Sequence, residues 1–569
     1  MKVIIVGGVA GGATAAARIR RLDEHAEITV FERSGYISYA NCGLPYYIGD
    51  VITDPEELTL QTPESFFKRF RINMKIHHEV ISIHPERKTV SVKNLENGEI
   101  FEENYDKLIL SPGAKPTQPR LPGVGMDKLF TLRTVEDTFR IKEYINKNHP
   151  KSAVLAGGGF IGLELAENLR ELGMDVTIVQ RPKQLMNPFD PDMASMIHNE
   201  MRKHGIKLVL GYTVEGFKEK DNGVEVLLKD NPSLQADMVV LAIGVTPDTA
   251  LAKEAGLELG IKGSIVVNDR METSVPDIYA AGDAVQVKHY VTGDDALISL
   301  AGPANKQGRI IADNICGGDS RYLGSQGSSV IKVFDMTAAT TGINETNAKK
   351  SGLEVDTVIL SPMSHAGYYP GGKVMTMKVV FEKETYRLLG AQIIGYEGVD
   401  KRIDVLATAI HAGLKATQLK DLDLAYAPPY SSAKDPVNMA GFMIDNIAKG
   451  TLKQWHLEDM DKISKDKSVV LLDVRTVGEF NRGHMDGFKN IPVDELRERI
   501  NEIEKGKPVY LICQSGLRSY IASRILEGNG YETYNFSGGF RFYDAVINDR
   551  ALIERAYACG MDYYSNPLK

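Results

Sequence analysis

Apolar runs and helical stretches alternate along the first half of the chain, in an order that occurs twice. In the first series, a β-branched run at 2–6 leads into a glycine-rich turn at 7–12 and an alanine-rich stretch. A second apolar run at 27–31 then ends in Glu32. This order predicts a strand, turn, helix and strand that bind a dinucleotide, because glycines admit a pyrophosphate at the helix N-terminus and the acid accepts from a ribose hydroxyl. A tight turn without a ligand is the less favoured alternative.

The second series ends differently from the first. Residues 153–156 run into Gly157-Gly158-Gly159-Phe160-Ile161-Gly162 and a helical stretch at 163–172, and the next strand at 176–179 is followed by Gln180-Arg181 in place of an acid. An acid suits the free 2′-hydroxyl of NAD, whereas an arginine can pair with the 2′-phosphate of NADP. The sequence therefore favours NADPH without excluding NADH.

Three further segments each end a strand in a glycine-containing turn, at 105–116, 237–247 and 275–284. Two glycine-rich series with such closing segments predict a tandem nucleotide-binding α/β fold. Because the last segment follows the second series, the order implies that the second unit is inserted into the first.

The last part of the chain predicts two more domains. From about residue 327, strand-like runs and one helical stretch predict an α+β domain; they lie at 330–333, 374–381, 388–394 and 400–413. After 447–456 a new unit begins, in which a strand at 509–512 runs into Cys513-Gln514-Ser515-Gly516-Leu517-Arg518-Ser519 and a helix. Backbone N–H groups of such a loop can surround a thiolate and hold an anionic persulfide. A buried structural cysteine is the alternative, which Gly516 and Arg518 disfavour.

Composition narrows the class of protein. At 569 residues the chain is too long for one core. A net charge of −8 argues against general nucleic-acid binding, and four cysteines without a close pair do not form a disulfide framework. The N-terminus enters a strand directly, so we expect no signal peptide, no membrane span and a cytoplasmic location with free thiols. No metal site is predicted.

Cys42 is the most conspicuous candidate for chemistry. It lies in Ser38-Tyr39-Ala40-Asn41-Cys42-Gly43-Leu44-Pro45, just beyond the first series. Flavoprotein disulfide reductases use two cysteines spaced as C-x4-C, but here Tyr47 stands five positions after Cys42. Cys42 must therefore work without a second local thiol: in a mixed disulfide with an external thiol, as a persulfide, or as a sulfenate. The proline predicts the first turn of a helix, whose N-terminus would favour a thiolate.

Arginines on the first predicted helix leave two interpretations open. Arg18, Arg20 and Arg21 form either a solvated face or a site for the phosphates of a nucleotide-bearing substrate.

Together these motifs resemble a known family. Residues 1–445 resemble the coenzyme A-disulfide reductases, which are single-cysteine pyridine nucleotide–disulfide oxidoreductases, and 457–569 resemble a rhodanese domain. The resemblance rests on 7–12, where Val9 belongs to the family pattern, 38–45, 281–283, 365–371 and 426–435, and in the rhodanese part on 473–475, 483–484 and 513–519. It implies FAD-binding residues 1–117 and 246–326, an NAD(P)-binding domain 118–245, a dimerisation domain 327–446, a linker 447–456 and a rhodanese domain 457–569.

The resemblance also implies roles for individual residues. Cys42 would be the redox nucleophile, assisted by Tyr368 and by Tyr426 of the partner subunit in a homodimer, while Cys513 and Arg518 would serve the rhodanese loop. FAD would be held by Gly7, Gly8, Ala10, Gly11, Glu32, Arg33, Ser111, Gly113, Arg133, Gly282 and Asp283. NAD(P) would be held by Gly157, Gly159, Ile161, Gly162, Gln180, Arg181 and Gly244. Coenzyme A would contact Thr14, Arg18, Arg21, Ser38, Asn41 and Lys434.

The resemblance implies a flavin-dependent NAD(P)H:coenzyme A persulfide or polysulfide reductase, which also reduces coenzyme A disulfide. Cys513 would deliver sulfane sulfur, because its C-x4-R loop is one residue shorter than the phosphatase-type loop. The alternatives are an NADH oxidase or peroxidase that uses a Cys42 sulfenate, and a non-enzymatic redox sensor or sulfur carrier. Cys316 and Cys559 have no assigned chemistry.

Overall fold

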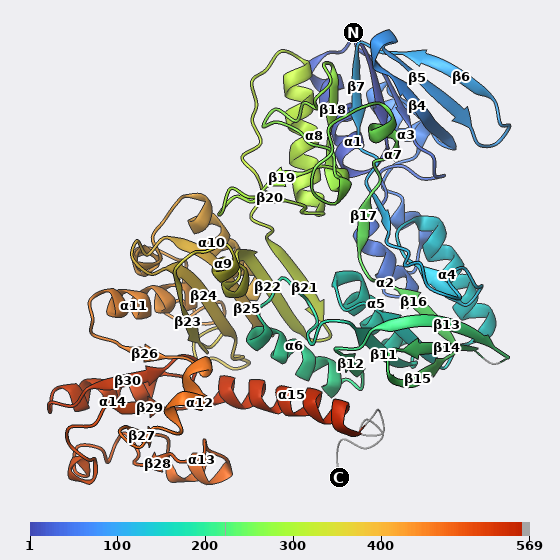
Figure 1. The fold of residues 1–569 in the computed structure, drawn as a ribbon. Helices are drawn as coiled ribbons and strands as arrows, with labels where there is room; N and C mark the ends of the chain where they lie inside the picture. The colour runs from blue at the N-terminus through green and yellow to red at the C-terminus, as the bar shows by residue number, and fades with distance from the viewer. Residues whose placement is uncertain (222, 560–569) are drawn as a thin grey trace. The chain divides into compact units, whose positions relative to one another are not determined.

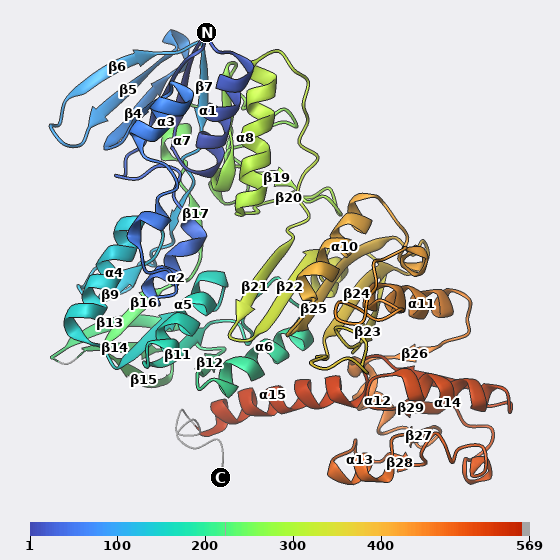
Figure 2. The same ribbon diagram turned by 180° about the vertical axis from the view of Figure 1, so that it is seen from behind.

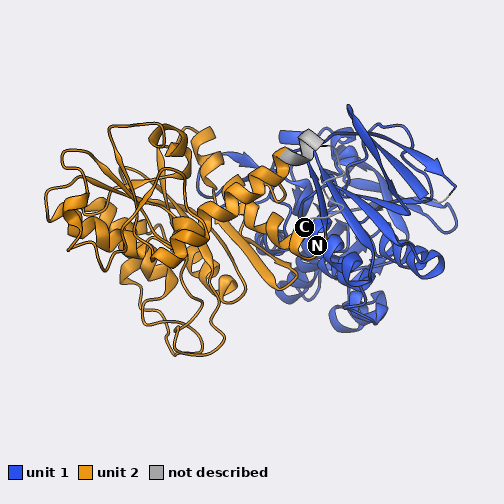
Figure 3. Ribbon diagram, turned by 90° about the horizontal axis from the view of Figure 1, so that it is seen from below, with its two compact units in different colours: residues 1–182, 206–327 blue, residues 183–205, 328–569 orange. Residues whose placement is uncertain are grey.

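The computed structural model describes residues 1–221 and 223–559, without the side chains of 555–559, among them Cys559. The chain divides into two compact units, which are described separately: residues 1–182 with 206–327, and residues 183–205 with 328–569 (Figure 3). Segment 183–205, which the sequence assigns to the nicotinamide domain, is therefore grouped with the second unit. The other domain boundaries stay a prediction.

The first series folds as a parallel sheet with the strand order β18-β7-β1-β2-β3. Its strands are β1 (Lys2–Val6), β2 (Glu27–Phe31), β3 (Asn73–Lys75), β7 (Lys107–Leu110) and β18 (Ile278–Ala280). β18 pairs with β7 in parallel although the whole second series lies between them in the chain. This pairing confirms that the second glycine-rich series is inserted into the fold of the first series.

The second series forms another parallel sheet, with the order β12-β11-β10-β16-β9. Its strands are β9 (Leu129–Thr131), β10 (Ser152–Ala156), β11 (Asp175–Gln180), β12 (Lys207–Leu210) and β16 (Met238–Leu241). The two connections between the sheets, β8 (Ala114–Pro116) and β17 (Val245–Pro247), pair with each other as an antiparallel ribbon. The tandem nucleotide-binding fold predicted from the sequence is thus confirmed.

Helix α1 (Ala10–Leu22) lies along α8 (Ala301–Ile315), as Figures 1 and 2 both show. The two helices approach closely because glycines face each other: a Cβ on Gly308 would lie 2.4 Å from the Gly11 carbonyl oxygen. The remaining elements of the first unit are α2 (Leu44–Ile48), α3 (Pro63–Phe70), α4 (Val135–Asn148), α5 (Phe160–Glu171), α7 (Ala250–Glu254), and the small sheets of β4 (His78–His84), β5 (Thr89–Asn94) and β6 (Ile100–Asn104), of β13 (Val214–Lys220), β14 (Gly223–Leu228) and β15 (Asn231–Ala236), and of β19 (Val287–Lys288) and β20 (Asp295–Ala296).

The second unit contains two five-stranded sheets. The antiparallel sheet β21-β22-β25-β24-β23 comes with α6, α9, α10 and α11, and the parallel sheet β26-β30-β29-β27-β28 with α12 to α15. The first set is α6 (Pro191–Lys203), β21 (Ser329–Val333), β22 (Met336–Gly342), α9 (Glu345–Lys350), β23 (Val355–Leu360), β24 (Thr376–Glu382), β25 (Leu388–Gly395), α10 (Val399–His411) and α11 (Pro436–Ala448). The second set is β26 (Gln454–Trp455), α12 (Met460–Ile463), β27 (Val470–Asp473), α13 (Val477–Arg482), β28 (Lys489–Asn490), β29 (Val509–Ile512), α14 (Leu517–Glu527), β30 (Thr533–Phe536) and α15 (Gly539–Cys559). Among the described residues, no helix has the length and apolarity needed to cross a bilayer.

Helix α15 is fixed to α6 by a buried polar cluster. His198 Nδ1 lies 2.8 Å from Asp549 Oδ2, and Arg202 Nη1 donates to Asp549 Oδ1 at 2.5 Å. His198 Nε2 accepts from the Leu185 N–H, so Nδ1 carries the proton that it donates to Asp549. Burial raises the pKa of Asp549, but His198 and Arg202 outweigh it and hold the pKa below its ordinary value. The carboxylate therefore joins two helices that lie far apart in the sequence.

We predict that Asp549→Asn lowers the free energy of unfolding by about 3 kcal/mol, because it removes the charge of a buried carboxylate and leaves the partly buried Arg202 beside an uncharged amide. Since the folded pKa of Asp549 is depressed, this difference is present above about pH 4 and closes as the pH falls further. Denaturant titrations at several pH values measure it. Asp544→Asn makes the same change at an exposed site on the same helix, and an equal loss there would contradict the prediction.

Candidate active site

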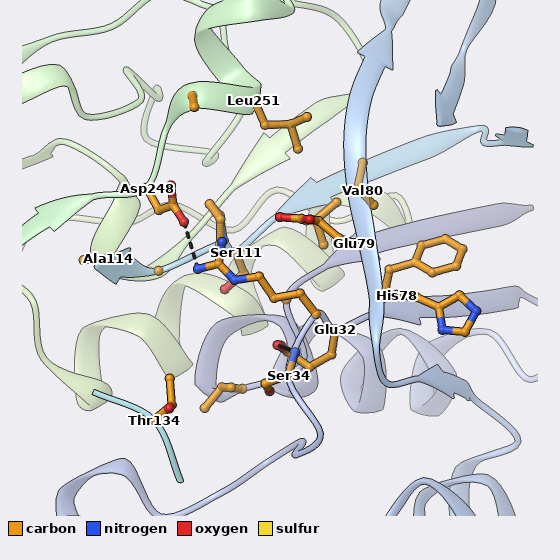
Figure 4. A pocket seen from close by; sticks show the side chains of 18 of the residues that line it. Glu32, Ser34, His78, Glu79, Val80, Ser111, Ala114, Thr134, Asp248 and Leu251 are labelled. Carbon is orange, nitrogen blue, oxygen red and sulfur yellow. Dashed lines mark hydrogen bonds and ion pairs between the residues drawn. The ribbon is translucent and has the colours of Figure 1, made fainter. Parts of the chain in front are cut away.

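The first unit contains a cavity of about 360 Å³ at the carboxyl ends of β1, β2 and β7 (Figure 4). Ligands of open α/β sheets bind at this end of the strands. Six residues predicted to hold the flavin line it: Gly7, Glu32, Arg33, Ser111, Gly113 and Arg133. The Glu32 carboxylate accepts from the Gly8 N–H and the Ser34 N–H, both at 2.9 Å, so the acid is fixed beside the glycine turn.

The glycine turns show which positions the protein itself constrains. Gly7 has a φ of +96°, and a Cβ there would lie 2.1 Å from the Ser111 carbonyl oxygen; Gly157 meets the Ala242 carbonyl oxygen in the same way at 2.2 Å. At Gly159, by contrast, nothing lies within 4 Å of an added Cβ, and Val9 at the matching place lines the cavity. The middle position is therefore open toward a ligand, which explains why valine is tolerated there.

A chain of polar contacts connects three predicted residues along this cavity. Arg133 Nη2 lies 2.6 Å from Asp283 Oδ2. In the amide orientation that satisfies both of its polar groups, Asn41 donates to the Arg133 carbonyl oxygen at 3.0 Å and accepts from the Arg133 guanidinium at 3.3 Å. Across the cavity Arg33 pairs with Asp248 at 2.9 Å, a partner that the sequence did not indicate (Figure 4). The donors, the acid and the open glycine turn fit a dinucleotide.

Cys42 is exposed and lies in a short turn, Asn41–Gly43, immediately before α2. The predicted helix is thus confirmed, with Pro45 in its first turn. Tyr47, five positions after Cys42, packs edge-on against Phe139 with ring centroids 5.7 Å apart. The place of a second thiol is therefore filled by an aromatic contact.

The charged groups around Cys42 oppose a thiolate, so an effect of the helix N-terminus stays a prediction. Partial burial of the sulfur raises the pKa of Cys42, the carboxylates of Glu164 and Asp283 raise it further, and Arg133 only partly opposes them. Helix α2 has five residues, so few aligned peptide dipoles act on the sulfur. The pKa of Glu164 is itself raised to about 7, by burial and by Glu167.

The three arginines of α1 have different surroundings. Arg20 is buried and donates to five backbone carbonyl oxygens, so it belongs neither to a solvated face nor to a phosphate site. Arg18 Nε donates to Asp313 on α8 at 2.7 Å, and Arg21 is exposed. Thr14, one turn before Arg18, donates to Asn305 at 2.6 Å. Thr14, Arg18 and Arg21 therefore share one helix face beside α8.

The second glycine turn repeats the contact seen at Glu32 with a neutral side chain. Gln180 Oε1 accepts from the Gly158 N–H at 3.1 Å. Because the carbonyl oxygen of Gln180 is used in this way, its amide group is left to donate. Arg181 next to it is exposed. This end of β11 thus presents donors where an acid would present acceptors.

In the second unit, Tyr368 and Tyr426 lie together, with their hydroxyl oxygens 2.7 Å apart. Their loops are joined by a buried arginine that the sequence did not indicate: Arg402 pairs with Asp435 at 3.0 Å and donates to the Ser364 carbonyl oxygen. The hydrogen bond to Tyr368 raises the pKa of Tyr426, so the Tyr426 hydroxyl keeps its proton at neutral pH. Tyr368 and Tyr426 of one chain thus lie side by side, and the expectation that Tyr426 serves the partner's cysteine stays a prediction. Lys434, in the same loop, is exposed.

The Cys513 side chain is fully buried at the end of β29, yet its surroundings are polar. Its Sγ accepts from the Gly516 N–H at 3.1 Å and from Ser519 Oγ at 3.2 Å. Gly516 has a φ of +97°, a conformation that favours glycine. The loop is therefore a nest of donors around sulfur, as the sequence predicted.

Arg518 is paired with a carboxylate from another segment of the same unit. Its two terminal nitrogens donate to the two oxygens of Glu479, each at 2.7 Å, and this contact lowers the pKa of Glu479 to about 2. The sequence offered one signal for Glu479: it lies three residues after Thr476, the spacing of a capping box, which the structure contains.

Comparisons with known proteins agree with this arrangement. Three family models match: pyridine nucleotide-disulphide oxidoreductase at residues 1–308, its dimerisation domain at 328–436, and a rhodanese-like domain at 456–545. The chain belongs to the pyridine nucleotide-disulphide oxidoreductases. Within them it falls in the coenzyme A disulfide reductase group that carries a C-terminal rhodanese domain, as the resemblance implied.

Three individual proteins are similar to this chain over most of their own length. A coenzyme A disulfide reductase of Staphylococcus aureus is 39% identical over 443 residues, which cover 78% of this chain and 99% of that protein. The structure of reduced Bacillus anthracis CoADR-RHD is 48% identical with a TM-score of 0.94, covering 96% of this chain and 98% of that one. An NAD-dependent persulfide reductase from A. fulgidus is 39% identical with a TM-score of 0.89, covering 95% and 100%.

We predict that Glu164→Gln speeds the alkylation of Cys42 about two- to fivefold near pH 8, because removing a nearby negative charge lowers the pKa of the thiol. The gain should shrink below pH 7, where Glu164 becomes protonated. Mass spectrometry of the labelled Cys42 peptide over a range of pH measures the rate. Glu171→Gln removes a carboxylate from an exposed position of the same helix and should leave the rate unchanged; an equal effect there would refute the assignment.

Proposed function

We propose that this protein is a flavin-dependent NAD(P)H:coenzyme A persulfide or polysulfide reductase that also reduces coenzyme A disulfide. One observation carries the proposal: a single reactive cysteine beside a dinucleotide cavity, with Tyr47 where a second thiol would be, is joined in one chain to a sulfur-binding Cys513 loop. A cysteine without a local partner needs a substrate thiol, and the second loop supplies sulfane sulfur.

At Cys42 the reaction is a thiol–disulfide exchange. The thiolate attacks the coenzyme A sulfur of the persulfide, the new bond forms the mixed disulfide with coenzyme A, and hydrosulfide leaves with the electron pair. Tyr368 and Tyr426, whose hydroxyls are hydrogen-bonded to each other, donate a hydrogen bond or proton to the leaving sulfur. When bound, FAD and NAD(P)H supply the two electrons that return the mixed disulfide to thiol and coenzyme A.

The cavity residues support FAD as the resident group. Glu32 would accept from the adenosine ribose, Arg133 and Asp283 would hold the polar part of the flavin end, and the open turn at Gly8 and Val9 would admit the pyrophosphate. Coenzyme A would lie against Thr14, Arg18 and Arg21, with Ser38, Asn41 and Lys434 as further contacts. The dimerisation domain at 328–436 supports a homodimer in which the tyrosine pair serves the partner's cysteine.

We predict that, without oxygen, coenzyme A persulfide oxidises NAD(P)H faster than coenzyme A disulfide, polysulfide or peroxide does, and that Cys42→Ser abolishes all of these activities. Absorbance at the nicotinamide band and released sulfide are measured together. Cys316→Ser is the matched control and should stay active. Preference for peroxide would favour the oxidase alternative; a water-forming NADH oxidase from Lactobacillus brevis is 31% identical to this chain. Activity that survives Cys42→Ser would contradict the proposal.

We predict a preference for NADPH, supported by the donor groups of Gln180 and Arg181. Replacing them together with Glu and Ala should lower kcat/KM for NADPH about tenfold or more and spare NADH, because a carboxylate repels the 2′-phosphate. Steady-state kinetics with both nucleotides decide this. Lys151→Ala removes an exposed cation at the opposite end of the same sheet and should change neither value. An unchanged ratio in the double variant would contradict the assignment.

A further inference from the structure

The two terminal nitrogens of Arg518, the arginine of the Cys513 loop, are both used by a single carboxylate. Arg518 and Glu479 form a two-pronged contact in which both oxygens of Glu479 accept, each at 2.7 Å. Such a fork matches the planar guanidinium to a carboxylate and is stronger than a single hydrogen bond. An anion entering the loop meets a cation whose charge Glu479 already balances, and it would have to displace Glu479 to make the same two-pronged contact.

Glu479 is itself held in place from a second direction. Its Oε2 accepts from the Thr476 N–H at 3.0 Å and from the Thr476 hydroxyl at 2.9 Å. Chiefly through its hydrogen bonds with Arg518, the pKa of Glu479 is lowered to about 2, so the carboxylate is charged throughout the physiological range. Arg518 and Glu479 together therefore carry no net charge.

The groups that touch the sulfur are neutral. They are the Gly516 N–H and the Ser519 hydroxyl. The other buried cation nearby, Arg475, is used by Asp473 at 2.6 Å and lies over the Phe540 ring. Arg541 is exposed, and its backbone N–H donates to the Gln514 carbonyl oxygen. The loop thus offers hydrogen-bond donors to one negative charge and no free arginine of its own to a second.

We propose that Glu479 determines which sulfur donors the Cys513 loop accepts. By holding Arg518, Glu479 favours organic persulfides, which carry at most one negative charge near the transferred sulfur, over thiosulfate, which is a dianion. The proposal rests on the proposed sulfur-transfer function of Cys513. In the step, the Cys513 thiolate attacks the outer sulfur of R–S–SH. A Cys513 persulfide bond forms, the donor S–S bond breaks, and the donor thiolate leaves with the electron pair. The exchange is redox-balanced and needs no further reactant.

The test compares two donors in the full-length enzyme, with cyanide as the common acceptor. Glutathione persulfide should be preferred by the unmodified protein. Glu479→Gln frees a guanidinium and should raise kcat/KM for thiosulfate about tenfold or more, since a hydrogen bond to a charged group is typically worth a factor of this size. The persulfide value should change less than about threefold. Glu498→Gln removes one charge from an exposed site of the same domain and should leave the ratio of the two donors unchanged.

A second variant shows whether the gain passes through Arg518. In Glu479→Gln combined with Arg518→Met, the thiosulfate gain should vanish; a gain that persists would overturn the proposal, as would a thiosulfate activity lost on Arg541→Ala. An unmodified enzyme that uses thiosulfate as well as glutathione persulfide would overturn it without any variant. The proposed function fails differently, because then neither donor gives sulfur transfer that depends on Cys513.

Discussion

The contact between Tyr47 and Phe139 imposes the constraint on which the chemistry of this protein depends. It places an aromatic ring where a disulfide reductase would have its second thiol, and it ties the short helix α2 to α4. Cys42 is left as an exposed sulfur without an intramolecular partner. Any two-electron chemistry at this sulfur must then begin with a bond to a molecule from outside, and the rest of the first unit positions that molecule and the electron donor.

The two cysteines proposed to react have different electrostatic surroundings. Cys42 lies among the carboxylates of Glu164 and Asp283, which together with burial raise its pKa. Cys513 accepts hydrogen bonds from two neutral donors. A protonated thiol reacts slowly with peroxide and with persulfide alike, because the thiolate is the nucleophile in both reactions. The groups around Cys42 therefore do not distinguish these acceptors, and the formation of the thiolate depends on what a bound substrate brings to the site.

Much of the fold could be predicted because buried parallel strands are continuous apolar runs bounded by glycine. Strands at 2–6, 27–31 and 509–512 begin and end where the sequence places them. Side-chain roles that depend on distant partners could not be predicted. Arg20 belongs to the same basic run as Arg18 but is buried against backbone carbonyls, and Arg402 joins two loops that no local pattern connects. A charge in a sequence shows what a residue can bind, and only the tertiary structure shows what it does bind.

This distinction bears on the arginines expected to meet anions. Arg18, Arg133 and Arg518 are each already paired with a carboxylate, so anion binding there is an exchange of partners, which yields less affinity than binding to a free cation but more selectivity. The three differ in what the exchange requires. Arg18 is held to Asp313 through Nε, which leaves its outer nitrogens toward a phosphate, whereas both terminal nitrogens of Arg518 are used by Glu479. A phosphate can therefore make a two-pronged contact with the terminal nitrogens of Arg18 without breaking its pair, whereas an anion at Cys513 can make that contact with Arg518 only after Glu479 moves away.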